Sequence, residues 1–258
     1  MALAKPTIVI ISGAWHTPAS YAKLSTALKS AHYEVHVPRI LSVNGVRPPN
    51  TDLYSDTDLI RAYVTSLIDA GREVIALMHS YGGQIGTNAL AGLGLSARQQ
   101  QGLPGGVSRL VYLAGSAFLE GATMMDIVRE FGHEHLMPLV FDIAEDLSSV
   151  HRDPKALLVG PGVSDEELEV YLGSLERWSS HGWNQPLQQC AWRDIPVTYV
   201  HTTQDMTVPF DYQKKMVERM NGEGARVDSV ELATGHCPHL TMPEAIVQVV
   251  DGIGGGRY

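Results

Sequence analysis

The stretch from Val74 to Gly83 constrains this chain most, because an apolar run ends there in a serine that is followed by glycines. It reads Val-Ile-Ala-Leu-Met-His-Ser-Tyr-Gly-Gly, and a helical pattern begins directly after it. A serine on a sharp turn between a strand and a helix forms a nucleophile elbow, which exposes the hydroxyl. We therefore predict a buried strand over 74–79 that presents Ser80 at its carboxyl end.

One position departs from the usual elbow pattern, Gly-x-Ser-x-Gly. Met78 stands where the first glycine is expected, whereas Gly82 keeps the second and more crowded position. The alternative interpretation is that Ser80 only caps a helix after a buried strand, as serine often does. This stretch by itself leaves both interpretations open.

Strand and helix patterns alternate along most of the chain, which predicts a mostly parallel, six-stranded sheet with helices on both faces. The six expected strands are 7–12, 33–37, 74–79, 110–114, 196–201 and 227–232. The interval between the fourth and fifth strands is too long for a structureless connection and contains helical stretches, one of them after Ser164. We predict an α/β core domain over 1–115 and 195–258, with a helical cap over 116–194 inserted in it.

A serine hydroxyl is a good nucleophile only when a base takes its proton, and a histidine held by a carboxylate is the usual base. Asp205 follows the fifth expected strand and His236 follows the sixth. Open α/β sheets bind ligands at the carboxyl ends of their strands, where Ser80, Asp205 and His236 all fall. We predict these three as a catalytic triad. Glu120, beyond the fourth strand, stays open as a second candidate for the acid.

The negative charge that develops in such a reaction needs an oxyanion hole of two backbone amides. One comes from the residue after the nucleophile, here Tyr81, and the other from a neighbouring loop. We predict Ala14, after the first expected strand, as the second donor. Tryptophans are mostly core residues, but Trp15, Trp178 and Trp183 are candidates to line an aromatic or hydrophobic substrate pocket.

With these motifs in place, the chain resembles the α/β-hydrolase superfamily, and within it the plant methylesterase and hydroxynitrile lyase group and its microbial relatives. The resemblance rests on residues 12–16, 79–83, 191–199 and 235–236. It implies the α/β-hydrolase fold and esterase or lactonase activity on small, often aromatic acyl or lactone substrates, without a cofactor. Besides Met78, the chain departs from the group at Ser12, where a histidine is common.

The α/β-hydrolase fold also supports activities other than ester or lactone hydrolysis. Hydroxynitrile lyases of the group use a lysine directly after the catalytic histidine, and Cys237 stands there instead. A non-hydrolytic enzyme, such as a lyase or a cofactor-free oxygenase, and a small-molecule binding protein both stay open, because fold does not fix function. Since all three triad candidates are present, we favour a serine hydrolase that works through an acyl-enzyme. His133 and His135 lack the spacing of a metal site, and no metal is expected.

Composition limits the partners and the compartment. The formal net charge is −9, with 19 Lys+Arg against 28 Asp+Glu and no basic run, which argues against nucleic acid. No apolar run approaches the ~20 residues of a membrane span. The two cysteines, Cys190 and Cys237, fit a reducing compartment. We expect a cytoplasmic protein with a small-molecule substrate, no cofactor and no nucleic-acid or membrane partner; whether it forms a homodimer stays open.

Overall fold

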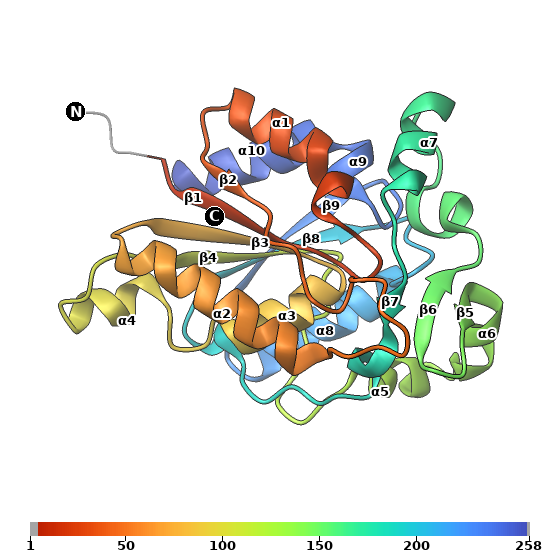
Figure 1. Ribbon diagram of the computed structural model, residues 1–258. Coiled ribbons are helices and arrows are strands. Elements are labelled where there is room, and N and C mark those ends of the chain that lie inside the picture. Colours follow the sequence, from red (N-terminus) through yellow and green to blue (C-terminus); the bar gives the residue numbers. More distant parts are fainter. Residues whose placement is uncertain (1–4, 257–258) are drawn as a thin grey trace.

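The computed structural model describes residues 5–256, and a six-stranded sheet runs through its centre. The strand order is β2-β1-β3-β4-β8-β9, and each strand is parallel to its neighbours. The strands are β1 (Thr7–Ile11), β2 (Val35–His36), β3 (Glu73–His79), β4 (Gly106–Leu113), β8 (Val197–Thr202) and β9 (Val227–Leu232). Figure 1 shows helices on both faces of this sheet. The predicted six-stranded parallel sheet is confirmed.

The helices of the core cover the sheet in two layers. They are η1 (Pro18–Tyr21), α1 (Ala22–Ser30), α2 (Leu53–Asp69), α3 (Tyr81–Ala89), α4 (Leu95–Gln100), α8 (Phe210–Gly222), α9 (Pro238–Thr241) and α10 (Pro243–Gly254). In β1, Ile8 and Ile10 pack in one apolar cluster with α1 and α10. Val9 and Ile11 belong to the opposite cluster, with α2, α3 and α8. Because successive side chains point to opposite faces and both faces are covered, β1 carries apolar side chains at four successive positions, Ile8 to Ile11.

The segment 116–194 lies beside the carboxyl ends of the strands, on the right in Figure 1. Its helical elements are α5 (Met124–Glu130), η2 (Glu134–Leu136), α6 (Met137–Val140), η3 (Lys155–Val159), α7 (Asp165–Gly173), η4 (Ser180–Trp183) and η5 (Ala191–Arg193). It also contains an antiparallel sheet of β5 (Phe141–Ile143), β6 (Ser148–His151) and β7 (Trp178–Ser179). The prediction of a helical cap over 116–194 did not include this sheet. Strands of two to four residues are too short to show an alternating pattern in the sequence.

The best defined helix start predicted in this segment is confirmed. The Ser164 hydroxyl accepts the backbone N–H of Glu167 at 3.2 Å, and α7 begins at the next residue, Asp165. Within residues 5–256, every helix is too short or too polar to cross a membrane.

Candidate active site

Ser80 lies on a sharp turn between β3 and α3. Its backbone φ of 52° and ψ of −123° lie outside the regions that residues with a side chain normally adopt. Gly82 allows α3 to start directly behind this turn, because a Cβ at that position would collide with the carbonyl oxygen of Ile11. The backbone of a nucleophile elbow is therefore present, and the glycine that the sequence keeps is one that the packing requires.

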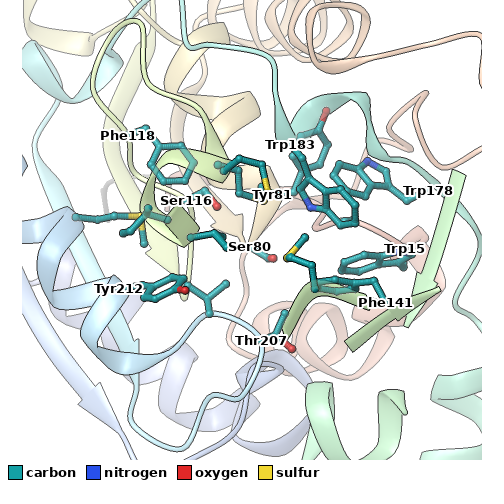
Figure 2. A pocket seen from close by; sticks show the side chains of 18 residues that line it. Trp15, Ser80, Tyr81, Ser116, Phe118, Phe141, Trp178, Trp183, Thr207 and Tyr212 are labelled. Carbon is teal, nitrogen blue, oxygen red and sulfur yellow. The ribbon is translucent and has the colours of Figure 1, made fainter. Parts of the chain in front are cut away.

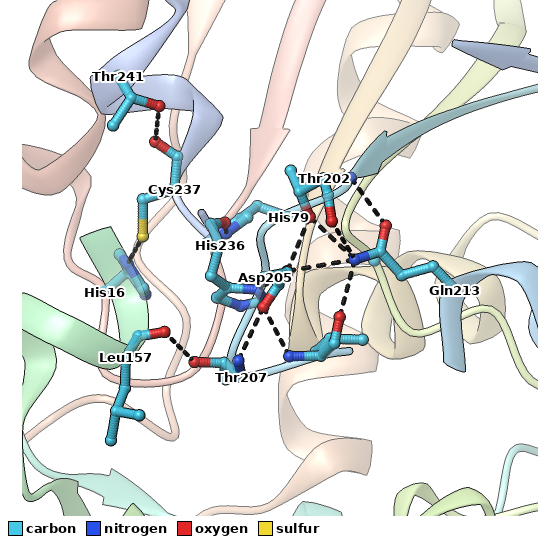
Figure 3. A network of polar contacts seen from close by, with 12 residues as sticks. His16, His79, Leu157, Thr202, Asp205, Thr207, Gln213, His236, Cys237 and Thr241 are labelled. Atoms are coloured by element: carbon cyan, nitrogen blue, oxygen red, sulfur yellow. Dashed lines mark hydrogen bonds and ion pairs between the residues drawn. The ribbon is translucent and has the colours of Figure 1, made fainter. Parts of the chain in front are cut away.

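Asp205 and His236 form a buried pair at the ends of β8 and β9. Oδ2 of Asp205 lies 2.7 Å from Nδ1 of His236. Oδ1 accepts the backbone N–H groups of Thr207 and Val208 at 2.8 Å each, and the Thr202 hydroxyl donates to Oδ2 at 2.8 Å. Figure 3 shows these contacts converging on the carboxylate. A carboxylate held in this way orients the imidazole with Nδ1–H toward Asp205, which leaves Nε2 as the basic nitrogen.

His236 and Ser80 lie on segments that meet behind the elbow. Nε2 of His79, the residue before Ser80, lies 2.9 Å from the carbonyl oxygen of His236. Within residues 5–256, Nε2 of His236 is buried and has no hydrogen-bond partner. The hydrogen bond between a nucleophile and its base is often long in a free enzyme and tightens when substrate binds. The basic nitrogen is thus unengaged next to the segment that carries Ser80.

Glu120, the second candidate for the acid, does not share this environment. Its side chain is exposed to solvent, whereas Asp205 is only 5% exposed. The structure therefore brings Asp205 rather than Glu120 against His236.

The two predicted oxyanion-hole residues, Ala14 and Tyr81, line the same cavity as Ser80. Tyr81 is the first residue of α3, and the first amides of a helix have no acceptor within that helix. Gly13 allows the loop before Ala14 to approach the elbow, because a Cβ at Gly13 would lie 3.0 Å from Cβ of Ser80. Both amides therefore belong to segments at the cavity that Ser80 faces.

Figure 2 shows this cavity, with Ser80 in its wall and aromatic side chains around it. The three predicted tryptophans, Trp15, Trp178 and Trp183, line one side together with Phe141. Trp15 stacks on Phe141 with ring centroids 5.3 Å apart, and Trp178 meets Trp183 edge to face at 5.4 Å. Trp178 is also fully buried, so it serves the core and the cavity at once.

Sequence reasoning missed most of the other residues that line the cavity. They are Ser116, Phe118, Met124, Met125, Ile127, Val128, Met137, Phe141, Thr207, Val208, Tyr212 and Met216. The adjacent pair Met124–Met125, directly after the helix-capping Thr123, was the available signal. Among the described residues that line the cavity, no side chain is charged. The cavity therefore suits an uncharged, hydrophobic molecule.

A cluster of buried histidines lies behind the elbow. One ring nitrogen each of His16, His79 and His239 lies within 4.8 Å of the others, a spacing that could hold a metal ion. However, both nitrogens of His16 and both of His79 already have hydrogen-bond partners within the protein. In this arrangement two of the three rings lack a free lone pair, so the cluster is not poised to bind a metal.

The parallel sheet, the elbow and the acid–histidine pair together define an α/β hydrolase. Residues 8–249 match the model of the alpha/beta hydrolase family, and the chain belongs to that family. It is 27% identical over 255 residues to "Probable hydrolase R7" of Phoma sp., which covers 98% of this chain and 100% of that protein.

Solved structures share the fold over nearly the whole chain. A pyrethroid hydrolase from Sphingobium faniae has a TM-score of 0.71 at 20% identity, covering 98% of this chain and 99% of that one. A methylesterase from Arabidopsis has a TM-score of 0.73 at 15% identity, covering 97% and 99%. The predicted resemblance to α/β hydrolases with plant esterase-like relatives is confirmed.

Proposed function

We propose that this protein is a serine hydrolase that cleaves a carboxylic ester or lactone of a small, uncharged, hydrophobic or aromatic molecule. The observation that carries the proposal is Ser80 on an elbow, in the wall of a cavity lined by uncharged side chains. A buried charge without a partner is costly, so this lining favours a neutral substrate. Ester hydrolysis also agrees with the names of similar proteins, a pyrethroid hydrolase and a methylesterase.

The proposed reaction is a two-step acyl transfer. The Ser80 hydroxyl attacks the carbonyl carbon while Nε2 of His236 takes its proton, and Asp205 stabilises the resulting imidazolium. The amides of Ala14 and Tyr81 hold the oxyanion. His236 returns the proton to the leaving alcohol, and an acyl-enzyme remains. A water molecule deprotonated by His236 then attacks the acyl carbon, which releases the carboxylic acid and restores Ser80.

We also propose that the segment 116–194 acts as a cap that selects the substrate. It contributes Phe141, Trp178 and Trp183 to the lining of the cavity, together with residues of α5. The core contributes Ser80 and the oxyanion residues. The catalytic step is thus assigned to the core and the choice of substrate to the inserted segment. The proposed reaction uses no cofactor.

The test combines turnover with labelling of the nucleophile. We expect the protein to hydrolyse p-nitrophenyl acetate and butyrate with a burst of nitrophenol, and a fluorophosphonate probe to form an adduct that peptide mass spectrometry locates on Ser80. Ser80→Ala should lose the burst and the adduct, whereas the surface variant Ser66→Ala should keep both. An adduct on another residue, or full turnover by Ser80→Ala, would overturn the proposal.

A further inference from the structure

The loop that carries Ala14 is tied to the segment that carries His236 by a chain of hydrogen bonds through His16. Nδ1 of His16 lies 2.6 Å from the carbonyl oxygen of Ala14. A carbonyl oxygen only accepts, so Nδ1 carries the ring hydrogen and Nε2 is an acceptor. The hydroxyl of Tyr171 lies 2.6 Å from this Nε2 and therefore donates to it.

The chain continues from Tyr171 to Cys237. The Tyr171 hydroxyl oxygen lies 2.9 Å from the Cys237 sulfur. Because the hydroxyl hydrogen is used by His16, this oxygen accepts the thiol hydrogen. Burial raises the pKa of the Cys237 thiol, so the thiol keeps its hydrogen. Each donor is thereby assigned, from Cys237 to Tyr171 to His16 to Ala14. Figure 3 shows His16 beneath the Cys237 sulfur, and its dashed line marks the longer contact of 3.8 Å between that sulfur and Nε2 of His16.

A second chain of hydrogen bonds runs beside the first and passes through His79, whose imidazole is in the opposite tautomer to that of His16. Nε2 of His79 donates to the carbonyl oxygen of His236, so its Nδ1 is the acceptor. The Tyr21 hydroxyl donates to Nδ1 at 2.8 Å and accepts the Gly13 N–H at 2.8 Å. The two chains start at adjacent residues of the oxyanion loop, Gly13 and Ala14, and end at adjacent residues, the catalytic candidate His236 and Cys237.

Both chains need neutral imidazoles, and burial keeps them neutral. Desolvation lowers the pKa of His16 to about 3 and holds that of His79 well below its ordinary value. Each ring therefore stays in one tautomer, because its single hydrogen is committed to a carbonyl oxygen.

Tyr171 belongs to α7 of the inserted segment, and its neighbours dock on the same loop. The backbone N–H of Glu176 donates to the carbonyl oxygen of Trp15 at 2.8 Å, and the Thr17 hydroxyl donates to that of Ser174 at 3.0 Å. The hydroxyls of Ser20 and Ser174 lie 2.7 Å apart. The loop after β1 is therefore held by the core on one side and by the inserted segment on the other.

We propose that His16 is a positioning residue: by holding the carbonyl group of Ala14 it fixes the loop that presents the Ala14 N–H, and Tyr171 makes this position depend on the docked inserted segment. The inference rests on the proposed function, because it assigns these residues a part in building the oxyanion hole. A hole formed by backbone amides has no side chain of its own to adjust, so hydrogen bonds to the loop must set its geometry.

The first test is Tyr171→Phe, which removes only the hydroxyl. The matched control is Tyr63→Phe, because the Tyr63 hydroxyl also bonds a histidine, Nδ1 of His36, at 2.7 Å on the far edge of the sheet. Since a small misplacement of oxyanion donors is costly, we expect Tyr171→Phe to lower kcat for p-nitrophenyl butyrate about 10- to 100-fold with KM within about twofold. Tyr63→Phe should match the wild type. Equal kcat values for the two variants would overturn the proposal.

The second test reads the tautomers directly and does not depend on turnover. Long-range ¹H–¹⁵N NMR correlations of histidine-labelled protein at pH 7 should show the hydrogen on Nδ1 of His16 and on Nε2 of His79. Loss of the His16 pattern in Tyr171→Phe, in a protein that stays folded, would support the chain; a hydrogen on Nε2 of wild-type His16 would refute it. A wild type without turnover or adduct would refute the proposed function instead, and the NMR result would still decide the chains.

Discussion

The side chain of Met78 occupies the space that a side chain at position 86 would need: a Cβ on Gly86 would collide with the Met78 sulfur. Met78 stands on β3 where the elbow pattern has glycine, and Gly86 lies on the facing side of α3. The missing glycine of the elbow is therefore matched by a glycine in the helix, which keeps α3 close to β3.

This relationship predicts that the effect of Gly86→Ala changes sign with residue 78. In the wild type the added methyl group overpacks the core, and we expect a loss of about 1–3 kcal/mol of unfolding free energy. In a Met78→Ala background the colliding sulfur is gone, and the remaining close neighbour of the added methyl group is Cδ1 of Ile11 at 3.1 Å, the end of a side chain that can shift slightly. The gain in helix propensity should then make Gly86→Ala stabilising by up to about 1 kcal/mol. Urea unfolding of the wild type, the two single variants and the double variant gives the four free energies of this double-mutant cycle. Additive effects of the two substitutions would contradict this account.

The acid of the proposed triad can be tested with two matched amides. Asp205→Asn keeps the shape of the side chain but removes the charge and the acceptor that orient His236, so kcat should fall by about 10⁴-fold. Glu120→Gln should retain wild-type kcat, because that side chain is exposed. Initial rates with p-nitrophenyl butyrate measure both effects. A large loss of kcat in Glu120→Gln together with a small loss in Asp205→Asn would assign the acid to Glu120.

The uncharged cavity predicts discrimination by charge. p-Nitrophenyl butyrate and mono-p-nitrophenyl succinate are of similar size, but the succinate would bury a carboxylate without a partner. We expect its kcat/KM to be at least about 100-fold lower. Met124→Lys, at a half-buried position of the cavity wall, should narrow this ratio, because lysine can supply a charge while its stem stays in apolar contact. Equal rates for the two esters in the wild type would exclude the proposed selection.

Buried histidines predict a loss of stability in acid. Burial lowers the pKa of His151 from 6.5 to about 3, and neither of its ring nitrogens has a hydrogen-bond partner within residues 5–256. Below pH 6.5 the unfolded chain takes up a proton that the folded chain refuses, so the contribution is complete above pH 6.5 and is lost as pH falls toward about 3. The slope is about 1.4 kcal/mol per pH unit for one such histidine.

The variant His151→Phe isolates this contribution. Between pH 6 and pH 4 its free energy of unfolding should fall less steeply than that of the wild type, by about 1.4 kcal/mol per pH unit. At neutral pH it should gain about 1–3 kcal/mol, because two unpartnered buried nitrogens are replaced by an apolar ring. Urea unfolding over this pH range measures both the slope and the gain at neutral pH. The control is His135→Gln, because His135 is exposed and its replacement should leave the slope unchanged. Parallel curves for His151→Phe and the wild type would contradict the assignment.

The sheet could be predicted from the sequence because β1, β3 and β4 carry continuous apolar runs and the other strands follow in the same alternation with helices. The candidate catalytic residues could also be predicted from their order along the chain. Ser80, Asp205 and His236 each follow a strand, and parallel strands place the residues after them at one edge of the sheet. The inserted sheet could not be predicted, since β5, β6 and β7 are too short to show a period. The cavity wall could not be predicted either, because it combines residues from distant parts of the chain, such as Met124 of α5 and Met216 of α8.

By itself, the sequence determined the fold class and the candidates for each catalytic role, because these depend on local patterns and on chain order. Only the tertiary structure distinguished the surroundings of Asp205 and Glu120, which both follow a strand: packing buries Asp205 against His236 and leaves Glu120 in solvent. It alone also assigned the tautomers of His16 and His79. Burial and hydrogen-bond partners belong to the assembled neighbours of a side chain, and those neighbours come from segments far apart in the sequence.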